Sequence, residues 1–407
     1  MKRFLVILAA LAVICALILS GCSNPTPTPS ATPKAPATSA APVPATSAAP
    51  VPATSAAPAP ASSSVAPKPS ASAPASSVAP SAGAKTIKFG YTMPKGASIG
   101  AGFEWFATEF PKRTNGRYVV QTYPNNTLAP VNGALDAVTS GAAEMMGTST
   151  GTFPKNFPLS LVVSIPTLGF PGGVISSYVE GSAALFDLYN AVPEVKNEFK
   201  DYQLVWTYTL DPYNLVSKKK DIHLPSDFKG MKIGGSGAKM DIVTAAGGAK
   251  VAMAPPDSYE NLDKGIVDAC FITFSQVNDY KIYEIANSYN KQDFGGGNYV
   301  ILMNKTFFAS MSPDDQKILT DTWKEANVVS GQTSLTGVVA GIKAVQDAKR
   351  TIITPTPAEV KAWQDAAVVS IQSWMNDAKA LNISQALLDK TLAAWKAALA
   401  AHLPNVK

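Results

Sequence analysis

The residues of this chain offer little for catalysis or for metal binding. The only histidines, His223 and His402, are far apart and have no further ligand types at the spacing of a metal site. Cys270 ends an apolar stretch, which is typical of a buried, unreactive thiol rather than of a nucleophile. We therefore predict no catalytic residue, no metal site and no cofactor, and we do not expect the chain to be an enzyme.

A glycine-rich run, Gly234-Gly235-Ser236-Gly237, is similar to the turns that bind anions between a strand and a helix. The letters G-G-S-G-A-K lack the Walker spacing of a nucleotide-binding loop, so a nucleotide is disfavoured. The backbone amides of Ser236 and Gly237 could still contact a small bound anion, and this alternative stays open.

Strands and helices alternate around the glycine-rich run. Apolar stretches, caps and turn residues predict strands at residues 231–233, 250–253 and 266–270 and helices at residues 238–246 and 259–264. Gly247-Gly248 closes the first of these helices, as glycines often do. Strand–helix–strand order with short connections predicts a parallel sheet.

A second region with the same alternation precedes it. Residues 85–93, 118–123 and 143–148 read as strands, and residues 99–113 and 134–140 read as helices. Open sheets of this kind bind ligands at the carboxyl ends of their strands. Further strands are expected at residues 203–209 and 294–304, and helices at residues 176–199 and 280–286. Ser312-Pro313 begins a mostly helical remainder that breaks near residues 354–357 and at Asn382.

The chain begins with a targeting segment. Lys2-Arg3 and the apolar residues 4–19 are typical of a signal peptide, and Leu19-Ser20-Gly21-Cys22 fits a lipoprotein box. We predict that residues 1–21 are removed and that Cys22 carries lipid. An uncleaved N-terminal anchor helix is the alternative, and both place the remainder outside the cytoplasmic membrane.

Residues 22–84 follow as a low-complexity linker rich in Pro, Ala, Ser and Thr, with the octapeptide VPATSAAP repeated in tandem. This composition cannot build a core, so we predict a disordered spacer. O-glycosylation of such a stalk stays open. The 407-residue chain has a formal net charge of +5, too mild to indicate a nucleic-acid partner. Of its three cysteines only Cys270 lies in the folded part, so no internal disulfide is expected there.

Three ordered phrases in this sequence resemble one protein family. They are residues 227–234 (DFKGMKIG), 248–253 (GAKVAM) and 258–269 (SYENLDKGIVDA). The chain resembles the solute receptors of tripartite ATP-independent periplasmic (TRAP) transporters, the family 7 solute-binding proteins. The family has an arginine after the lysine and isoleucine of the first phrase, whereas this chain has Gly234.

The resemblance implies an α/β fold of the type II periplasmic-binding-protein class, with two lobes, a hinge and a long C-terminal helical region. We expect residues 85–210 and 297–340 in the first lobe, and residues 211–296 and 341–407 in the second lobe and the C-terminal helices. The resemblance also implies a small organic solute held between the lobes, and partner permease subunits in the membrane. An ion gradient would supply the energy, so the receptor would need no chemistry of its own.

The same resemblance gives candidate ligand-binding residues. The register of the family places binding positions at Thr92, at Thr148 or Ser149, at Tyr213 or Asn214, at Gly234 and at Ile272. We expect further cleft residues at Trp206, Ser236, Gly237, Pro255, Phe271 and Asn298, although core packing is the default for an aromatic such as Trp206.

Both arginines that usually hold a ligand carboxylate in this family are absent at the matching positions. We therefore predict a more apolar pocket whose ligand is not a typical dicarboxylate or sugar acid. An amide, an aromatic or branched-chain acid, or a neutral molecule would fit. A sensory or surface lipoprotein that uses the receptor fold without transport is the alternative function.

Overall fold

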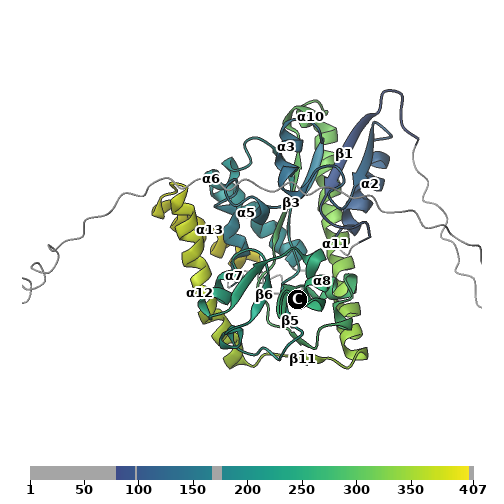
Figure 1. Ribbon diagram of the computed structural model, residues 1–407. Helices are drawn as coiled ribbons and strands as arrows, with labels where there is room; N and C mark the ends of the chain where they lie inside the picture. The colour runs from purple at the N-terminus through teal and green to yellow at the C-terminus, as the bar shows by residue number, and fades with distance from the viewer. Residues whose placement is uncertain (1–78, 97–98, 167–176, 403–407) are drawn as a thin grey trace, which may run out of the picture. The chain divides into compact units, whose positions relative to one another are not determined.

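The computed structural model describes residues 79–402, except for residues 97–98 and 167–176. The predicted signal peptide, Cys22 and most of the linker therefore lie outside the described residues. Within them the chain forms two α/β lobes, each built on its own sheet, and ends in long helices (Figure 1). The predicted fold class is confirmed.

The first lobe is built on a five-stranded sheet. Its strands are β1 (Lys85–Tyr91), β2 (Tyr118–Tyr123), β3 (Met145–Ser149), β4 (Gln203–Thr209) and β10 (Asn298–Met303), in the order β2-β1-β3-β10-β4. β1 is parallel to β2 and β3, whereas β10, which returns from the second lobe, is antiparallel to both of its neighbours. The carboxyl ends of the parallel strands β1 and β3 therefore lie at the same edge of the sheet, and so do the residues that follow them.

Short helices and an aromatic core complete this lobe. The helices are α2 (Ala101–Arg113), α3 (Ala134–Thr139), α5 (Ser182–Ala191), α6 (Pro193–Asn197) and α10 (Lys305–Ala309), with a π-helical turn η5 (Ser177–Gly181) and 3₁₀ turns η1 (Val131–Gly133), η2 (Thr150–Thr152) and η3 (Ser160–Ser164). Phe103 of α2 packs against Phe89, Tyr91, Tyr299 and Trp323. These buried rings join the sheet, α2 and the C-terminal helix that carries Trp323 in one core.

The second lobe has a six-stranded sheet with the order β11-β9-β5-β8-β6-β7. Its strands are β5 (Asn214–Ser217), β6 (Lys232–Gly235), β7 (Ala249–Ala252), β8 (Ala269–Ile272), β9 (Ser288–Asn290) and β11 (Thr351–Ile353). Its helices are α7 (Met240–Ala245), α8 (Ser258–Asp263) and α9 (Phe274–Asp279), with 3₁₀ turns η6 (Pro225–Phe228), η7 (Pro255–Asp257) and η8 (Ile282–Glu284). β6 is parallel to both β7 and β8, as the sequence predicted.

The helix expected at residues 280–286 is wrong. The helix lies earlier, as α9, because Thr273 and Gln276 form a reciprocal capping box: the hydroxyl of Thr273 accepts from the amide of Gln276, and the side chain of Gln276 accepts from the amide of Thr273. Lys281 then takes a left-handed conformation with φ of 55°, and only the 3₁₀ turn η8 follows. The short strands β9 and β11 were not predicted.

Three helices end the chain: α11 (Pro313–Asp347), α12 (Pro357–Ala380) and α13 (Gln385–His402). The predicted helix start is confirmed, since the Ser312 hydroxyl accepts from the amide of Asp315 and Pro313 takes the first turn. We expected residues 341–407 in the second lobe. In the structure α13 instead contacts α5 and η3, and its Leu388 and Trp395 belong to a first-lobe core.

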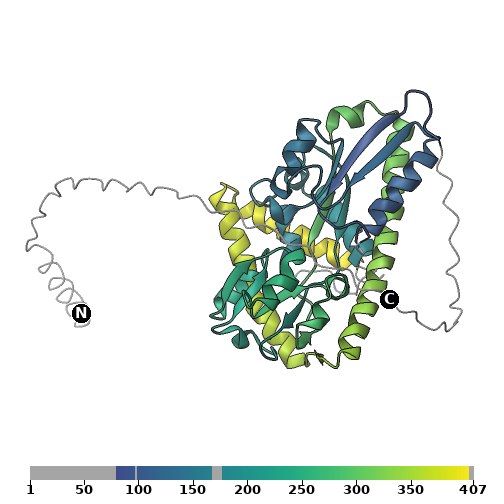
Figure 2. The same ribbon diagram turned by 45° about the vertical axis from the view of Figure 1, so that its right-hand side comes forward.

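Helix α11 runs alongside both lobes, as both ribbon views show (Figures 1 and 2). It packs against α2 in the first lobe and against α9 in the second. Glycines allow the close approach: a Cβ atom on Gly102 of α2 would lie 2.2 Å from the Ala326 carbonyl oxygen, and one on Gly341 would lie 2.1 Å from the Phe274 carbonyl oxygen.

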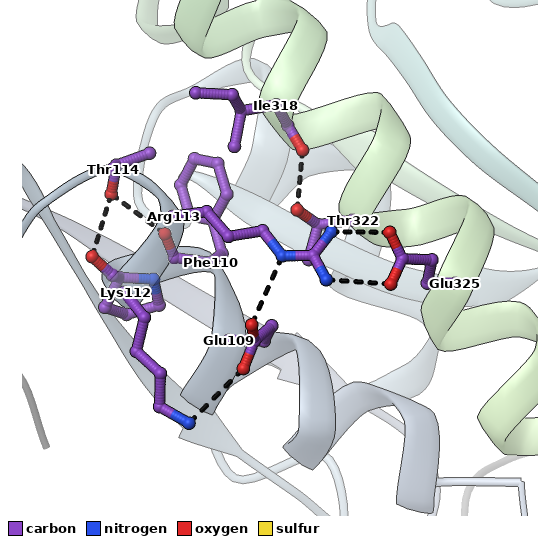
Figure 3. A network of polar contacts seen from close by, with 9 residues as sticks. Glu109, Phe110, Lys112, Arg113, Thr114, Ile318, Thr322 and Glu325 are labelled. Atoms are coloured by element: carbon purple, nitrogen blue, oxygen red, sulfur yellow. Dashed lines mark hydrogen bonds and ion pairs between the residues drawn. The ribbon is translucent and has the colours of Figure 1, made fainter. Parts of the chain in front are cut away.

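An ion-pair network on the surface also joins α2 to α11 (Figure 3). Both terminal nitrogens of Arg113 donate to the carboxylate of Glu325, at 2.7 Å each, and its Nε donates to Glu109 at 3.3 Å. The two parallel bonds fix the guanidinium plane between the helices. The Arg113 side chain therefore links α2 to α11.

The close contact at Gly341 generates a stability prediction. Replacing Gly341 with Ala should lower the free energy of unfolding by about 1–3 kcal/mol, because the new methyl group overlaps a backbone carbonyl and forces α11 away from α9. The measurement is denaturant unfolding of the variant. Thr336→Ala on the exposed face of the same helix is the control and should shift stability by less than about 0.5 kcal/mol. An unchanged or higher midpoint for Gly341→Ala would contradict the close packing.

Candidate ligand-binding site

Two chain segments cross between the sheets, and they pair with each other. The amide of Leu210 donates to Gly297 at 2.9 Å, the amide of Tyr213 donates to Gly295 at 3.0 Å, and the amide of Phe294 donates to Tyr213 at 3.0 Å. A Cβ atom on Gly296 would lie 2.2 Å from the Leu210 carbonyl oxygen, so only glycine allows this approach. The two crossovers form a short two-stranded connection.

A cavity of about 840 Å³ lies beside these crossovers, and residues from both lobes line it. Its lining includes residues that follow the carboxyl ends of the parallel strands, such as Thr92 after β1, Ser236 after β6 and Met253 after β7. This is where open α/β sheets bind ligands. Much of the lining is apolar and includes Met93, Val131, Leu161, Leu210, Met253, Pro255, Pro256, Phe294, Trp374 and Leu381.

Six of the predicted site residues line this cavity. They are Thr92, Ser149, Tyr213, Ser236, Gly237 and Pro255. The hydroxyl groups of Thr92 and Tyr299 lie 3.1 Å apart, so the first lobe offers a paired hydroxyl at its edge of the cavity. Tyr299, also in the lining, was not predicted because nothing in its strand marks it apart from the buried residues around it. That these residues contact a ligand stays a prediction.

The structure places four other predicted residues in polar or apolar packing away from the cavity. Thr148 is buried in β3, and its neighbour Ser149 is the residue that lines the cavity. Trp206 packs edge-on against Phe186 in the first lobe. The amide of Asn298 bonds Thr207 and Tyr189. The Asn214 side chain donates to the backbone oxygen of Gln292. Neighbouring residues of a strand point to opposite faces, so an error of one position in the predicted register places a core residue where a cavity residue is expected.

Phe271 and Ile272 also belong to the second-lobe core. Phe271 packs against Phe228 and Phe294, and Ile272 is fully buried in β8. Phe294 lines the cavity, so Phe271 supports the wall from behind.

Gly234, which stands where the family has arginine, does not line the cavity. Its Cβ position would lie 2.8 Å from the methyl carbon and 2.9 Å from the sulfur of Met253. Met253 is 6% exposed and is itself part of the cavity wall. The thioether therefore fills the space beside residue 234 that a longer side chain there would need.

Lys239 was not among the predicted site residues. This residue directly precedes α7, lines the cavity and is only 7% exposed. Its Nζ donates to the Ser236 carbonyl oxygen at 2.6 Å and lies 3.6 Å from the centre of the Tyr213 ring. The sequence G-G-S-G-A-K does place Lys239 at the start of an expected helix, beside the possible anion-binding turn. No neighbouring residue in the sequence indicates, however, that the Lys239 side chain is buried.

Burial lowers the pKa of Lys239 to about 7. The unfolded chain would hold that proton up to its ordinary pKa of 10.5. Unfolding therefore takes up a proton between these two values, and this lysine makes the folded state more stable as pH rises from about 7 to about 10.5. Below pH 7 the charged ammonium is present in both states, and the folded chain carries the full cost of its burial.

The cavity lining contains no arginine. The whole sequence has four, of which Arg113, Arg117 and Arg350 lie in the described residues. Arg113 joins α2 to α11 (Figure 3), Arg117 bonds Asp315, and Arg350 bonds Asn287 and the Glu284 carbonyl oxygen. Every arginine downstream of the leader is therefore engaged elsewhere, which agrees with the predicted loss of the carboxylate clamp.

The remaining charged groups of the lining are Lys155, Asp241 and Asp377. Burial and the charge of Asp377 raise the pKa of Asp241. A second, smaller pocket of about 320 Å³ lies beside Glu198, where burial raises the pKa of that carboxyl to about 7. That carboxylate accepts from the amides of Leu159 and Ser160, so it already serves the fold by holding η3. The larger cavity, shared by both lobes, is the better ligand site.

The geometry gives no support for catalysis. Residues 147–151 (GTSTG) match the G-x-S-x-G pattern of serine hydrolases, and Ser149 does end a strand. The base that such a serine needs is missing, however, because His223 contacts Glu359 at 2.8 Å and His402 contacts Asp187 at 2.8 Å. Among residues 79–402, with their gaps, no cluster of acidic, histidine or cysteine side chains could hold a metal ion.

In the described part of the chain, no helix combines the length and the apolar character needed to span a bilayer.

The contact between Gly234 and Met253 generates a second prediction. Gly234→Arg should destabilise the fold by about 1–3 kcal/mol, because its side chain must displace Met253. Met253→Ala opens that space, so the double variant should be at least about 1 kcal/mol more stable than the sum of the single changes. The measurement is a double-mutant cycle by denaturant unfolding. Pairing Gly234→Arg with Leu319→Ala, in the first-lobe core, is the control and should be additive. Additivity in both pairs would refute the contact.

Known proteins share this architecture. The family model for "Bacterial extracellular solute-binding protein, family 7" matches residues 89–377. The C4-dicarboxylate-binding periplasmic protein DctP of Rhodobacter capsulatus is 24% identical over 319 residues, which cover 77% of this chain and 91% of the relative.

Solved structures agree with this match. A TRAP periplasmic solute-binding protein from Desulfovibrio salexigens is 25% identical, with a TM-score of 0.67, over 78% of this chain and 96% of its own. A TRAP solute-binding protein from Rhodoferax ferrireducens, in complex with copurified benzoate, is 21% identical, with a TM-score of 0.70, over 79% and 99%. The resemblance noted in residues 227–269 is thus confirmed: this chain belongs to family 7 of the bacterial extracellular solute-binding proteins, which are non-enzymatic receptors of TRAP transporters.

Proposed function

We propose that this receptor captures a small, largely apolar organic acid with a single carboxylate and delivers it to the membrane permease of a TRAP transporter. The observation that carries the proposal is the cavity of about 840 Å³, whose lining is rich in apolar side chains and lacks arginine. A pocket of this kind gains affinity by covering apolar surface and uses a few polar groups for orientation.

Charge in the lining disfavours a dicarboxylate. A second ligand carboxylate needs a second buried partner of opposite charge, and leaving it unpaired is costly. Besides Lys239 the lining offers only the exposed Lys155 as a cation, and the carboxylates of Asp241 and Asp377 would repel a dianion. The relatives differ on this point: one is named for C4-dicarboxylates and another was solved with benzoate. The lining favours the second type of ligand.

Each lobe contributes polar groups to this proposed site. The first lobe supplies the Thr92 and Tyr299 hydroxyls and Ser149, and the second supplies Ser236 and Lys239. Residues 85–210 and 297–340 would form the first lobe and residues 211–296 the second, with the paired crossovers as the hinge between them. Closing the lobes would remove the apolar part of the ligand from water.

We further propose that the receptor is tethered outside the cell membrane through lipid on Cys22, with residues 23–84 as a spacer. Support comes from the basic and apolar leader and from the sequence Leu19-Ser20-Gly21-Cys22. Several acyl chains on one cysteine would give stable anchoring, whereas one chain would not.

Ligand screening tests the proposed specificity. Full-length receptor should be stabilised against heat by aromatic monocarboxylates such as benzoate, phenylacetate or mandelate at micromolar concentration, and mass spectrometry of the purified protein should detect a copurified acid. Succinate and malate are the matched controls and should give no shift at the same concentration. Micromolar stabilisation by succinate alone would overturn the proposed ligand class while leaving the family unchanged.

Fractionation of cells tests the proposed anchor. Wild-type receptor should sediment with membranes and incorporate a radiolabelled or clickable fatty acid. Cys22→Ser should abolish labelling and move the protein to the soluble extracytoplasmic fraction or leave an unprocessed precursor. Cys270→Ser, which changes a buried thiol, is the control and should keep the label. Labelling that persists in Cys22→Ser would refute the lipidation site.

A further inference from the structure

Among the lysines that the structure describes, Lys239 is the buried one, and no carboxylate there forms an ion pair with it. Several exposed lysines of the helices pair with acids one turn away, as Lys343 does with Asp347 and Lys361 does with Asp365. Lys239 is 7% exposed, and the structure records only the carbonyl oxygen of Ser236 and two aromatic rings around its ammonium. Burying an ammonium group in this way is costly unless a counter-charge is present for part of the time.

The surroundings of this lysine belong to the cavity. Ser236 and Tyr213 both line it, and Lys239 lines it with them. The ammonium lies 3.6 Å from the Tyr213 ring centre, so the aromatic face stabilises the charge and holds the side chain in one place. A cation fixed in an apolar wall is a preorganised contact for an anionic ligand group.

Charged and titratable groups around this end of the cavity do not neutralise the lysine. On its own helix, on the two crossovers, after α9 and on α12, these groups are Asp241, Asp211, Tyr213, Asp293, Tyr280 and Asp377, of which Asp211 bonds Ser275 and Tyr178. No ion pair joins Lys239 to a carboxylate in the described residues, and its pKa shift has burial as its cause. The pKa of Asp241 is raised by burial and by the charge of Asp377, and it is lowered by Lys250 rather than by Lys239.

We propose that Lys239 is the specificity-determining residue that pairs with the ligand carboxylate, in place of the absent arginine, and that it takes up a proton when an acid binds. This rests on the proposed function. The neutral amine costs little to bury in the free receptor. An incoming carboxylate favours the ammonium form, so the proton moves from solvent to Nζ and an ion pair forms inside the cavity. An arginine, which stays charged at every pH of interest, could not show this linkage.

The proton linkage gives the proposal a signature. The free lysine, with its pKa at about 7, is largely neutral at pH 8, so binding of one carboxylate should take up about one proton there and about 0.1 proton at pH 6. Affinity for the acid should fall by about tenfold for each pH unit above pH 8. An amide of the same shape should bind with no proton uptake and no such pH dependence.

The experiment is isothermal titration calorimetry on full-length receptor, in buffers of different ionisation enthalpy at pH 6, 7, 8 and 9. The probes are benzoate, phenylacetate and mandelate, each with its amide. Lys239→Met keeps the length of the side chain and removes its charge, so it should fold. It should bind the acids on the order of 10- to 100-fold more weakly at pH 6, with no proton uptake and with unchanged affinity for the amides.

Lys229→Met is the matched control, because Lys229 is an exposed lysine of the same lobe and outside the cavity. It should bind like the wild type. Acid binding that Lys239→Met leaves unchanged, or wild-type binding without proton uptake at pH 8, overturns the role of Lys239 but not the proposed function. A receptor that binds none of the acids at pH 6 overturns both.

Discussion

Close packing of α11 against both lobes is the constraint on which the rest of the structure depends. The helix reaches α2 and α9 only because Gly102 and Gly341 lack side chains at the points where backbones meet. Together with the two paired crossovers, it sets where the strand ends of one sheet stand relative to those of the other. The cavity exists because these ends face one space, and its walls come from residues that directly follow the strands.

Two residues, Gly234 and Lys239, account for the polarity and charge of the cavity. Gly234 leaves room for the Met253 thioether, which closes the wall with an apolar surface. Lys239 brings a single positive charge from the start of α7, against the face of Tyr213. The cavity is therefore mostly apolar, and its described lining lacks arginine and has Lys239 as its one buried cation. Under the proposed function, the number of negative charges on the ligand would then decide whether it binds.

The sequence predicted what local interactions decide. The cap at Ser312, the parallel strands around residues 231–270 and the family phrases all depend on residues close in the chain. It failed where distant residues decide. The burial of Lys239 depends on Tyr213, 26 positions earlier, and the surroundings of Gly234 depend on Met253, which follows the next strand. Register errors of one residue separated Thr148, in the core, from Ser149, in the cavity wall, and the apolar face of α13 did not reveal which lobe it would cover.

The return of α13 to the first lobe has a consequence for how the protein is made. Leu388 and Trp395 complete a core whose other members, such as Leu185 and Val300, are synthesised much earlier. Because a ribosome releases the chain from its N-terminus, that core stays incomplete until the last helix has emerged. This core can therefore close only after the whole chain has been translated, whereas the aromatic core around Phe103 needs no residue beyond α11.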